Sequence, residues 1–362
     1  MNTFLSVPCA TDRNPIRAPA LLRAIAASCR FVPADTSHRH TRKTCFASLL
    51  LAAVAGIPTA QAQDRSANWP VRPIKIIIGF APGGSTDTPM RVLADSASRL
   101  LKQPVIIENK PGAGGTLPAV ALQSAPNDGY TLGVASLGVY RLPYTTDLKW
   151  DPARDLTYII GLTGYAFGIV VPASSPIKNW TDYLAAAKAK PGQLTYGSPG
   201  VATTNHLTME RISRRAGIQL NHIPYKGTGE TMQAMLSQQV DSAAETSAWA
   251  PYVKDGKMRL LVTWGTKRMS SFPDVPTLKE LGIPISQTSY WGLIAPKGTD
   301  PAIVAKVHDV FKQAMEQPEF RNALARYDME PDYRSSRDFH QFAVDTMKQE
   351  KEILDTLGLS RK

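Results

Sequence analysis

The sequence predicts an α/β protein with largely parallel sheets, arranged as two domains. Apolar strand-like runs alternate with amphipathic stretches along the chain, which is the pattern of α/β layers. Two segments of the same design, residues 167–176 and 291–301, mark places where the chain would pass between domains. About 300 residues follow a predicted leader, and that length is enough for two hydrophobic cores.

Each predicted strand is an apolar run bounded by Gly, Pro, Asn or polar residues, and its β-branched and aromatic residues favour extended backbone. The predicted strands are residues 74–80, 104–109, 130–136, 157–162, 167–172, 194–200, 221–225, 258–265 and 291–296. Helix-like segments such as 181–189 and 229–239 separate them. Residues 335–358 predict a long surface helix, because a capping-box pattern from Ser335 to Asp338 precedes apolar residues at helical spacing.

The two similar segments read “FGIVVPASSP” and “WGLIAPKGTDP”. Each begins with an aromatic residue and Gly, continues with three mostly apolar residues and Pro, and ends with a short polar turn and a second Pro. Strands of this kind suit a chain that crosses between two domains twice, so we expect one domain at 69–166 plus 290–362 and the other at 167–289. The alternative is that they are two unrelated strand-turn-helix units.

The first 62 residues predict a signal peptide. Residues 39–43 are basic, residues 45–57 are an apolar run too short to span a membrane, and Ala60 and Ala62 suit cleavage after Ala62. The alternative is an organelle transit peptide, since this region has seven Arg or Lys against two Asp or Glu. Cleavage leaves a formal net charge of about +6 from the +11 of the whole chain. These charges are scattered, which suits an anionic small molecule or an acidic surface but not nucleic acid.

Metal and thiol chemistry have no support in the sequence after the leader. All three cysteines lie within the leader, which excludes disulfides, thiolate metal sites and a cysteine nucleophile. No two of the later histidines have metal-ligand spacing. Nucleotide motifs fail too, because Leu117 stands where the dinucleotide fingerprint needs Gly or Ala. Neither Ser136 nor Ser198 has the neighbours of a hydrolase elbow. We therefore expect no metal, no cofactor and no catalytic set.

A Gly-rich turn follows the first predicted strand. Gly83 and Gly84 let the backbone approach a ligand, while Ser85, Thr86 and Asp87 can cap the helix that follows. A second such turn lies in residues 108–119, with three more glycines. Free N–H groups at helix starts favour an anion, and turns after neighbouring parallel strands face one crevice. The alternative is that both turns are ordinary strand-to-helix connections.

Similar turns occur in the second predicted domain. Hydroxyl groups and backbone N–H groups in these turns suit a carboxylate. His206 and Lys226 each have an ordinary alternative, the first as a structural residue and the second as a solvated one. The residues concerned are Ser198, Thr203, Thr204, His206, Tyr225, Lys226 and Gly227.

The order of these motifs resembles one family. The motifs are “RPIKIIIGFAPGGSTD”, “PVIIENKPGAGG”, “NDGYTLGVAS”, “TYGSPGVATTNHL”, “IPYKGTGETMQAMLSQQVD”, “GKMRLLVTWGTKR”, “PDVPTLKELGIP” and “WGLIAPKGTDPAIVAKV”. Together, over about residues 69–360, they resemble the periplasmic solute-binding proteins of tripartite tricarboxylate transporters, also called the Bug family.

The resemblance implies a two-domain periplasmic binding protein of type II, Venus-flytrap-like, with two crossing strands at the hinge. Such a protein is a monomer that captures a small carboxylate, delivers it to the subunits of a membrane permease and is not an enzyme. By matching position, the first clamp would be Phe80, Gly83, Gly84, Ser85, Thr86 and Asp87. The remaining ligand-binding residues would be Ser136, Ser198, Thr203, Thr204, His206, Tyr225 and Gly227.

Two departures from the family pattern leave alternatives open. Glu245 follows “QVD” where an Asp-containing segment is usual, and we include it among the ligand-binding residues as a reader of an amine or hydroxyl. Tyr140 and Arg141 replace small or polar residues; Tyr140 would either stack on a ligand ring or fill space. The rival functions are a ligand sensor for a membrane receptor and an extracytoplasmic enzyme with Asp87 or Glu245 as acid or base.

Overall fold

The computed structural model describes residues 68–361, which belong to one compact unit. The predicted signal peptide, its cleavage after Ala62 and the three cysteines lie outside the described residues. Within the described range, no helix is both long and apolar enough to cross a membrane.

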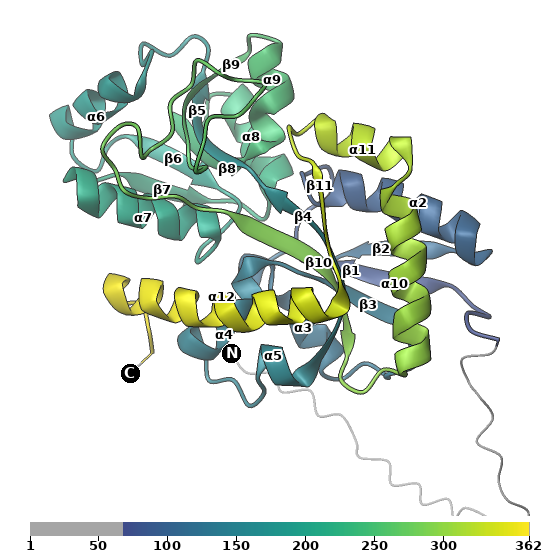
Figure 1. The fold of residues 1–362 in the computed structure, drawn as a ribbon. Coiled ribbons are helices and arrows are strands. Elements are labelled where there is room, and N and C mark those ends of the chain that lie inside the picture. The colour runs from purple at the N-terminus through teal and green to yellow at the C-terminus, as the bar shows by residue number, and fades with distance from the viewer. Residues whose placement is uncertain (1–67, 362) are drawn as a thin grey trace, which may run out of the picture. The chain divides into compact units, whose positions relative to one another are not determined.

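Two β-sheets organise the described chain (Figure 1). Sheet A has six strands in the order β11-β4-β10-β3-β1-β2, and sheet B has five in the order β7-β6-β8-β5-β9. The strands of sheet A are β1 (Ile74–Ile78), β2 (Val105–Asn109), β3 (Thr131–Ala135), β4 (Leu156–Tyr165), β10 (Ser289–Pro296) and β11 (Pro331–Arg334). Those of sheet B are β5 (Phe167–Pro172), β6 (Thr195–Ser198), β7 (Asn221–Pro224), β8 (Ser242–Thr246) and β9 (Met258–Thr263).

All nine predicted strands are present, but the prediction of largely parallel sheets was wrong. Four strand pairs are parallel and five are antiparallel. The antiparallel pairs all involve β4, β5 or β10, the strands next to the passages between sheets. Thus β10, which returns the chain to sheet A, runs against both of its neighbours, β3 and β4, and β5, the first strand of sheet B, runs against β8 and β9.

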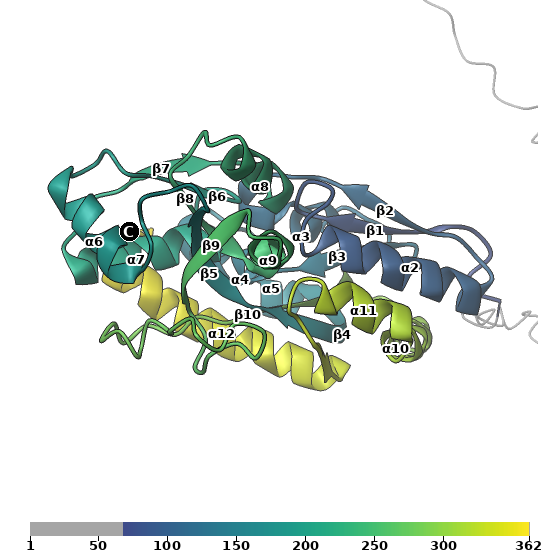
Figure 2. The ribbon, with the colours of Figure 1, turned by 90° about the horizontal axis from the view of Figure 1, so that it is seen from above.

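Helices cover both sheets, and Figure 2 shows α10 and α11 beside α2. We call sheet A with its helices lobe A, and sheet B with its helices lobe B. Lobe A has α2 (Asp87–Leu101), α3 (Leu117–Leu122), α4 (Leu137–Thr145), α5 (Pro152–Asp155), α10 (Pro301–Met315), α11 (Pro318–Ala325), α12 (Ser336–Leu357) and the short 3-10 helix η1 (Ala113–Gly115). Lobe B has α6 (Trp180–Ala189), α7 (Thr204–Ala216), α8 (Thr228–Leu236), α9 (Ala250–Lys254) and the 3-10 helix η2 (Ser247–Trp249).

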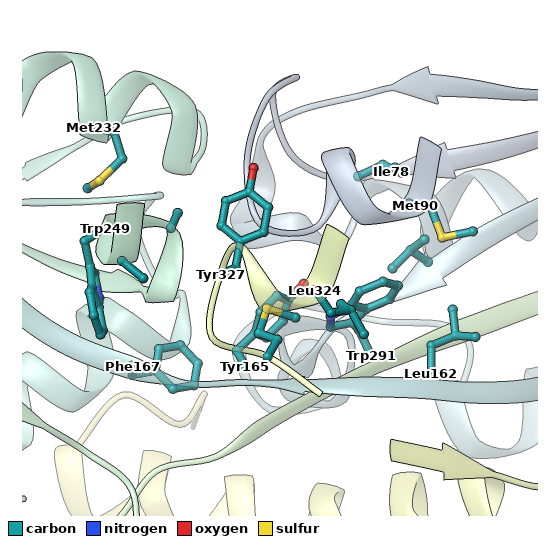
Figure 3. Packing of buried hydrophobic residues seen from close by; sticks show 14 of the residues in the cluster. Ile78, Met90, Leu162, Tyr165, Phe167, Met232, Trp249, Trp291, Leu324 and Tyr327 are labelled. Carbon is teal, nitrogen blue, oxygen red and sulfur yellow. The ribbon is translucent and has the colours of Figure 1, made fainter. Parts of the chain in front are cut away.

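The chain passes between the sheets at the two predicted segments. Only Ala166 separates β4 of sheet A from β5 of sheet B, and β10 returns the chain to sheet A after β9. Aromatic side chains fill this passage, where Phe167 stacks on Trp264 with ring centroids 5.4 Å apart. The ring centroids of Tyr165 and Trp291, both labelled in Figure 3, lie 6.1 Å apart. The domain boundaries expected from the sequence, 69–166 plus 290–362 and 167–289, remain a proposal.

The predicted C-terminal helix is confirmed as α12. The Ser335 side chain caps it by accepting a hydrogen bond from the Asp338 N–H at 3.1 Å. Its last turn contacts α7 of lobe B, where Leu354 and Leu357 pack on Leu207. A helix of lobe A therefore also contacts lobe B.

Candidate functional site

A cavity of about 40 Å³ lies between lobes A and B. One water molecule needs about 10–15 Å³ by this measure, so the space suits a small group of atoms. It is lined by Phe80, Ser85, Thr86, Gly114, Ser136, Leu137, Gly138, Tyr165, Phe167, Pro199, Thr203, Thr204, Asn205, Thr228, Thr246 and Ser289.

Four helices begin at this cavity. Ser85 and Thr86 precede α2, Ser136 precedes α4, Thr203 precedes α7, and Thr228 is the first residue of α8. The first N–H groups of a helix have no partner within the helix, and the dipole makes that end positive. Two helices from each lobe therefore bring positive potential and hydrogen-bond donors to one space, which favours an anion.

The predicted clamp, Phe80 to Asp87, divides into two groups. Phe80, Ser85 and Thr86 line the cavity, whereas Gly83, Gly84 and Asp87 are not part of its lining. The three belong instead to the turn that shapes this wall.

Asp87 fixes the turn from behind. Its carboxylate accepts hydrogen bonds from the Gly83 N–H at 2.9 Å, from Arg91 Nε at 3.0 Å and from Asn109 Nδ2 at 2.8 Å. Since these donors occupy both carboxylate oxygens, the side chain holds the turn in shape.

The expectation that hydroxyls cap α2 was wrong. No side chain makes a capping bond at its start. The Thr86 hydroxyl instead lies 2.6 Å from the Tyr165 hydroxyl, and the Ser85 hydroxyl lies 2.7 Å from that of Thr246 in lobe B. The Thr86 backbone has helical dihedral angles rather than the extended ones usual for a capping residue, and both hydroxyls bond within the cavity wall instead.

The predicted residues of lobe B also divide. Thr203 and Thr204 line the cavity, and Ser198 is buried beneath them with its hydroxyl 2.7 Å from His222 Nε2. His206 stacks on His222 with ring centroids 4.3 Å apart, while its Nδ1 accepts the Ala202 N–H at 3.3 Å.

The two histidines support the loop before α7. Burial, with a smaller effect of neighbouring His206, lowers the pKa of His222 to about 4. Burial also lowers the pKa of His206, against the opposing charge of Glu210. Both rings therefore favour the neutral form, which lets His206 Nδ1 accept a hydrogen bond.

Tyr225, Lys226 and Gly227 lie at the turn before α8, outside the lining. Lys226 is exposed, and its backbone N–H donates to Glu230 at 3.0 Å. Gly227 is buried against lobe A: a Cβ there would lie 2.9 Å from the Ala81 nitrogen. A Cβ on the neighbouring Gly229 would lie 2.8 Å from the Pro82 carbonyl oxygen. The two lobes therefore touch through backbone that tolerates no added atom.

Glu245 is fully buried directly behind the cavity wall. Its Oε2 accepts from the Thr228 hydroxyl and from the Thr246 N–H, each at 3.0 Å. Its Oε1 has no hydrogen-bond partner among residues 68–361. Burial raises the pKa of the carboxyl to about 7, although the nearby hydroxyls of Thr231 and Thr228 and the Thr246 N–H oppose that rise. It contacts two lining threonines and is not itself part of the lining.

The second departure from the family pattern is structural. Tyr140 is buried in a core cluster of lobe A with its ring centroid 6.2 Å from that of Phe342, so it fills space. Arg141 forms a buried ion pair with Glu350 of α12. It also donates to the Ala202 carbonyl at 3.2 Å and to the Thr204 hydroxyl at 3.1 Å in lobe B.

Sequence reasoning missed several lining residues. Asn205 and Thr228 stand directly beside predicted residues in the same turns, so the rule that helix starts face the crevice would have found them. Leu137, Gly138 and Pro199 likewise adjoin Ser136 or Ser198, and Gly114 belongs to the second predicted Gly-rich turn. Tyr165, Phe167, Thr246 and Ser289 lie at strand ends, where only the fold brings them together. The missed lining residues are Gly114, Leu137, Gly138, Tyr165, Phe167, Pro199, Asn205, Thr228, Thr246 and Ser289. In the part of the chain that the structure describes, no cluster of His, Cys, Asp or Glu could hold a metal ion.

Comparison with known proteins identifies close relatives in sequence. Residues 90–359 match the family model described as tripartite tricarboxylate transporter family receptor. The chain is 59% identical over 309 residues to the UPF0065 protein in the gbd 5' region of Cupriavidus necator. That alignment covers 85% of this chain and 94% of the relative.

Two solved structures share the fold. The periplasmic binding protein BugD superposes with a TM-score of 0.77 at 25% identity, covering 81% of this chain and 100% of BugD. MatC from Rhodopseudomonas palustris, with bound malate, gives 0.74 at 28% identity, covering 79% of this chain and 100% of MatC. These likenesses confirm the predicted α/β fold of a periplasmic binding protein.

Proposed function

Because the chain belongs to the tripartite tricarboxylate transporter receptor family, or Bug family, we propose that it captures a small carboxylate between lobes A and B. It then delivers that carboxylate to a membrane permease of the same transporter type. The structural relative MatC holds malate, a dicarboxylate. The protein acts as a binder, so the compound leaves the site unchanged.

The four helix starts at the cavity are the observation that carries this proposal. A carboxylate placed there meets unpaired N–H groups from α2 and α4 of lobe A and from α7 and α8 of lobe B. Hydroxyls of lining residues such as Ser85, Ser136 and Thr204 add further donors. Each hydrogen bond to a charged group contributes about 1.5–3 kcal/mol, so a few of them suffice for firm but reversible binding.

The ligand completes the contact between the lobes. Since donors come from both lobes, the anion favours the arrangement in which they meet, and the strands at Ala166 and β10 form the hinge. The closed form is then what the permease recognises. We expect the protein to act as a monomer in the periplasm after export by the predicted leader.

A ligand screen tests the proposal. The chain from Gln63, which lies within one compact unit, is heated with mono-, di- and tricarboxylates, amino acids and aromatic acids, and each mixture is then analysed by mass spectrometry. We expect at least one carboxylate to raise the melting temperature and to be recovered unchanged. Chemical conversion would indicate an enzyme, and no shift with any acid would refute carboxylate capture.

A matched pair of variants ties the effect to the cavity. Ser136 lines it, and its hydroxyl contacts the Gly115 carbonyl oxygen only at 3.5 Å, so it is available to a ligand. Ser136→Ala should reduce the shift given by the stabilising acid. Ser124→Ala, at an exposed position, should leave it unchanged.

A further inference from the structure

The lining of the cavity contains no charged side chain. Among the described residues that line it there are hydroxyls, an amide, aromatic rings and backbone, but no Lys, Arg, His, Asp or Glu. Positive potential comes from the helix starts, each equivalent to about half an elementary charge. No lining side chain can therefore form an ion pair with a carboxylate of the ligand.

Two arginines that contact the turns around the cavity are already paired with carboxylates. Arg141, which reaches the start of α7, is paired with the Glu350 carboxylate in a buried contact. Arg91, beside the first turn of α2, is paired with Asp87 at 3.0 Å. The positive charge of each guanidinium is therefore already balanced by a carboxylate of the protein and not by a second carboxylate of the ligand.

Glu245 adds negative charge behind the wall. It is fully buried, bonded to lining residues Thr228 and Thr246, and Oε1 lacks a partner within the described chain. The Thr246 hydroxyl is in turn bonded to that of Ser85, at the start of α2. Thr246 therefore links the hydroxyl at that helix start to the Glu245 carboxyl.

We propose that the ligand is a short carboxylic acid with a single negative charge and an uncharged polar tail, and that Glu245 is the residue that rejects a second negative charge. This inference rests on the proposed function. A second carboxylate inside the closed cavity would meet no cation and would be repelled by Glu245 at short range, where charges interact strongly. A hydroxyl or amide in the same place would find hydrogen-bond partners in the lining.

The burial of Glu245 explains how a ligand with one negative charge can bind beside it. Burial raises the pKa of this carboxyl to about 7, so an incoming anion promotes uptake of a proton. A protonated Oε1 could also donate a hydrogen bond. By linkage, carboxylate affinity should then rise as the pH falls.

Thr228 and Thr231 of α8 bring uncharged hydroxyl groups to the Glu245 carboxyl. Gly168 of β5 and Trp249 of η2 meet the backbone of Glu245. Charged residues of these and adjoining elements are engaged elsewhere: Glu230 with the Lys226 N–H, Arg211 with Gln287, and Glu210 with His206. Among these charged residues, Glu245 is the one that is hydrogen-bonded to the lining of the cavity.

Matched pairs of acids test the inference by calorimetry at pH 8. Each pair joins a dicarboxylate to its half-amide, which has the same size but one charge fewer: malonate with malonamate, succinate with succinamate, and glutarate with glutaramate. We expect the best-binding half-amide to bind at least about tenfold more tightly than its dicarboxylate. Equal or tighter binding of the dicarboxylate would overturn the inference and leave carboxylate capture standing. If none of these acids binds, the inference also fails; if no acid in the wider screen binds, so does the proposed function.

Two variants test whether Glu245 causes the preference for the half-amide. Glu245→Gln keeps an acceptor for Thr228 and Thr246 but removes the charge, so the preference for the half-amide should shrink at least about threefold. Glu230 is an exposed residue in the same turn of α8 as Thr228. Glu230→Gln removes its charge and should leave the preference for the half-amide unchanged. An unchanged preference in Glu245→Gln would show that the residue does not select by charge.

Discussion

The hydroxyl of Ser85 lies 2.7 Å from the hydroxyl of Thr246, so the start of α2 in lobe A is hydrogen-bonded to the end of β8 in lobe B. Both residues line the cavity, and the backbone N–H of Thr246 binds buried Glu245. A carboxylate at the α2 turn would share the Ser85 hydroxyl with Thr246. Ligand binding and contact between the lobes are thereby joined at one pair of atoms.

Removing the Ser85 hydroxyl should weaken binding of a stabilising acid by about ten- to a hundredfold, because a charge-assisted hydrogen bond is lost. Thr246→Val, which keeps the shape but removes a neutral bond, should cost less than about tenfold. Titration calorimetry measures the affinity of each variant for that acid, with Ser124→Ala, at an exposed position, as the control. Wild-type affinity in Ser85→Ala would contradict its role.

Gly229→Ala should separate folding from binding. Alanine favours a helix over glycine by about 1 kcal/mol, so α8 should not be destabilised. The added Cβ would lie 2.8 Å from the Pro82 carbonyl oxygen of lobe A, so contact between the lobes should be hindered. We expect an unchanged or higher melting temperature without ligand and affinity lower by tenfold or more. Gln233→Ala, on the exposed side of α8, is the control; full affinity in Gly229→Ala would show that this contact is not needed.

Stability should depend on pH through Glu245. Its pKa is about 7 in the folded chain and near 4.5 when unfolded, so the folded state binds more protons between those values. This contribution is fully present below about pH 4.5 and is lost as the pH rises through 7, by up to about 3 kcal/mol. Urea unfolding between pH 5 and 8 should show wild type losing stability relative to Glu245→Gln. Parallel curves for the two proteins would refute the assignment.

The Arg141–Glu350 ion pair should matter mainly when one partner is missing. Arg141→Met leaves a buried carboxylate without its cation and should cost about 3–5 kcal/mol of unfolding free energy. The double variant Arg141→Met/Glu350→Met should recover much of that loss. Arg154→Met, which breaks an exposed pair, should change little in the same urea titration. A double variant no more stable than the single one would argue against this account.

Much of the fold could be predicted because apolar strands leave a clear pattern. The two missed strands lack it: β8 reads “SAAET” and β11 reads “PDYR”. The backbone pairing of β8 with β5 and β6 makes it a strand, and this is set by neighbours distant in sequence. Strand direction also escaped prediction, because local sequence does not record which way a strand runs in its sheet.

The site was predictable where it follows a local rule. Ser85, Thr86, Ser136, Thr203 and Thr204 were found because hydroxyls at helix starts are visible in the sequence. Asp87 was assigned to the ligand although its oxygens are taken by Gly83, Arg91 and Asn109. The partner of a carboxylate depends on side chains that meet only in the folded chain, and so does the choice between capping and bonding across the lobes.

The helix starts around the cavity have an evolutionary consequence. Backbone N–H groups are present whatever side chain a codon specifies, so the capacity to hold an anion is inherited with the fold itself. On the proposed function, substitutions at lining positions such as Phe80, Phe167 and Ser289 would change which acid is accepted without removing these N–H groups. Retargeting this protein as a sensor for another metabolite would begin at those three side chains and leave the helix starts untouched.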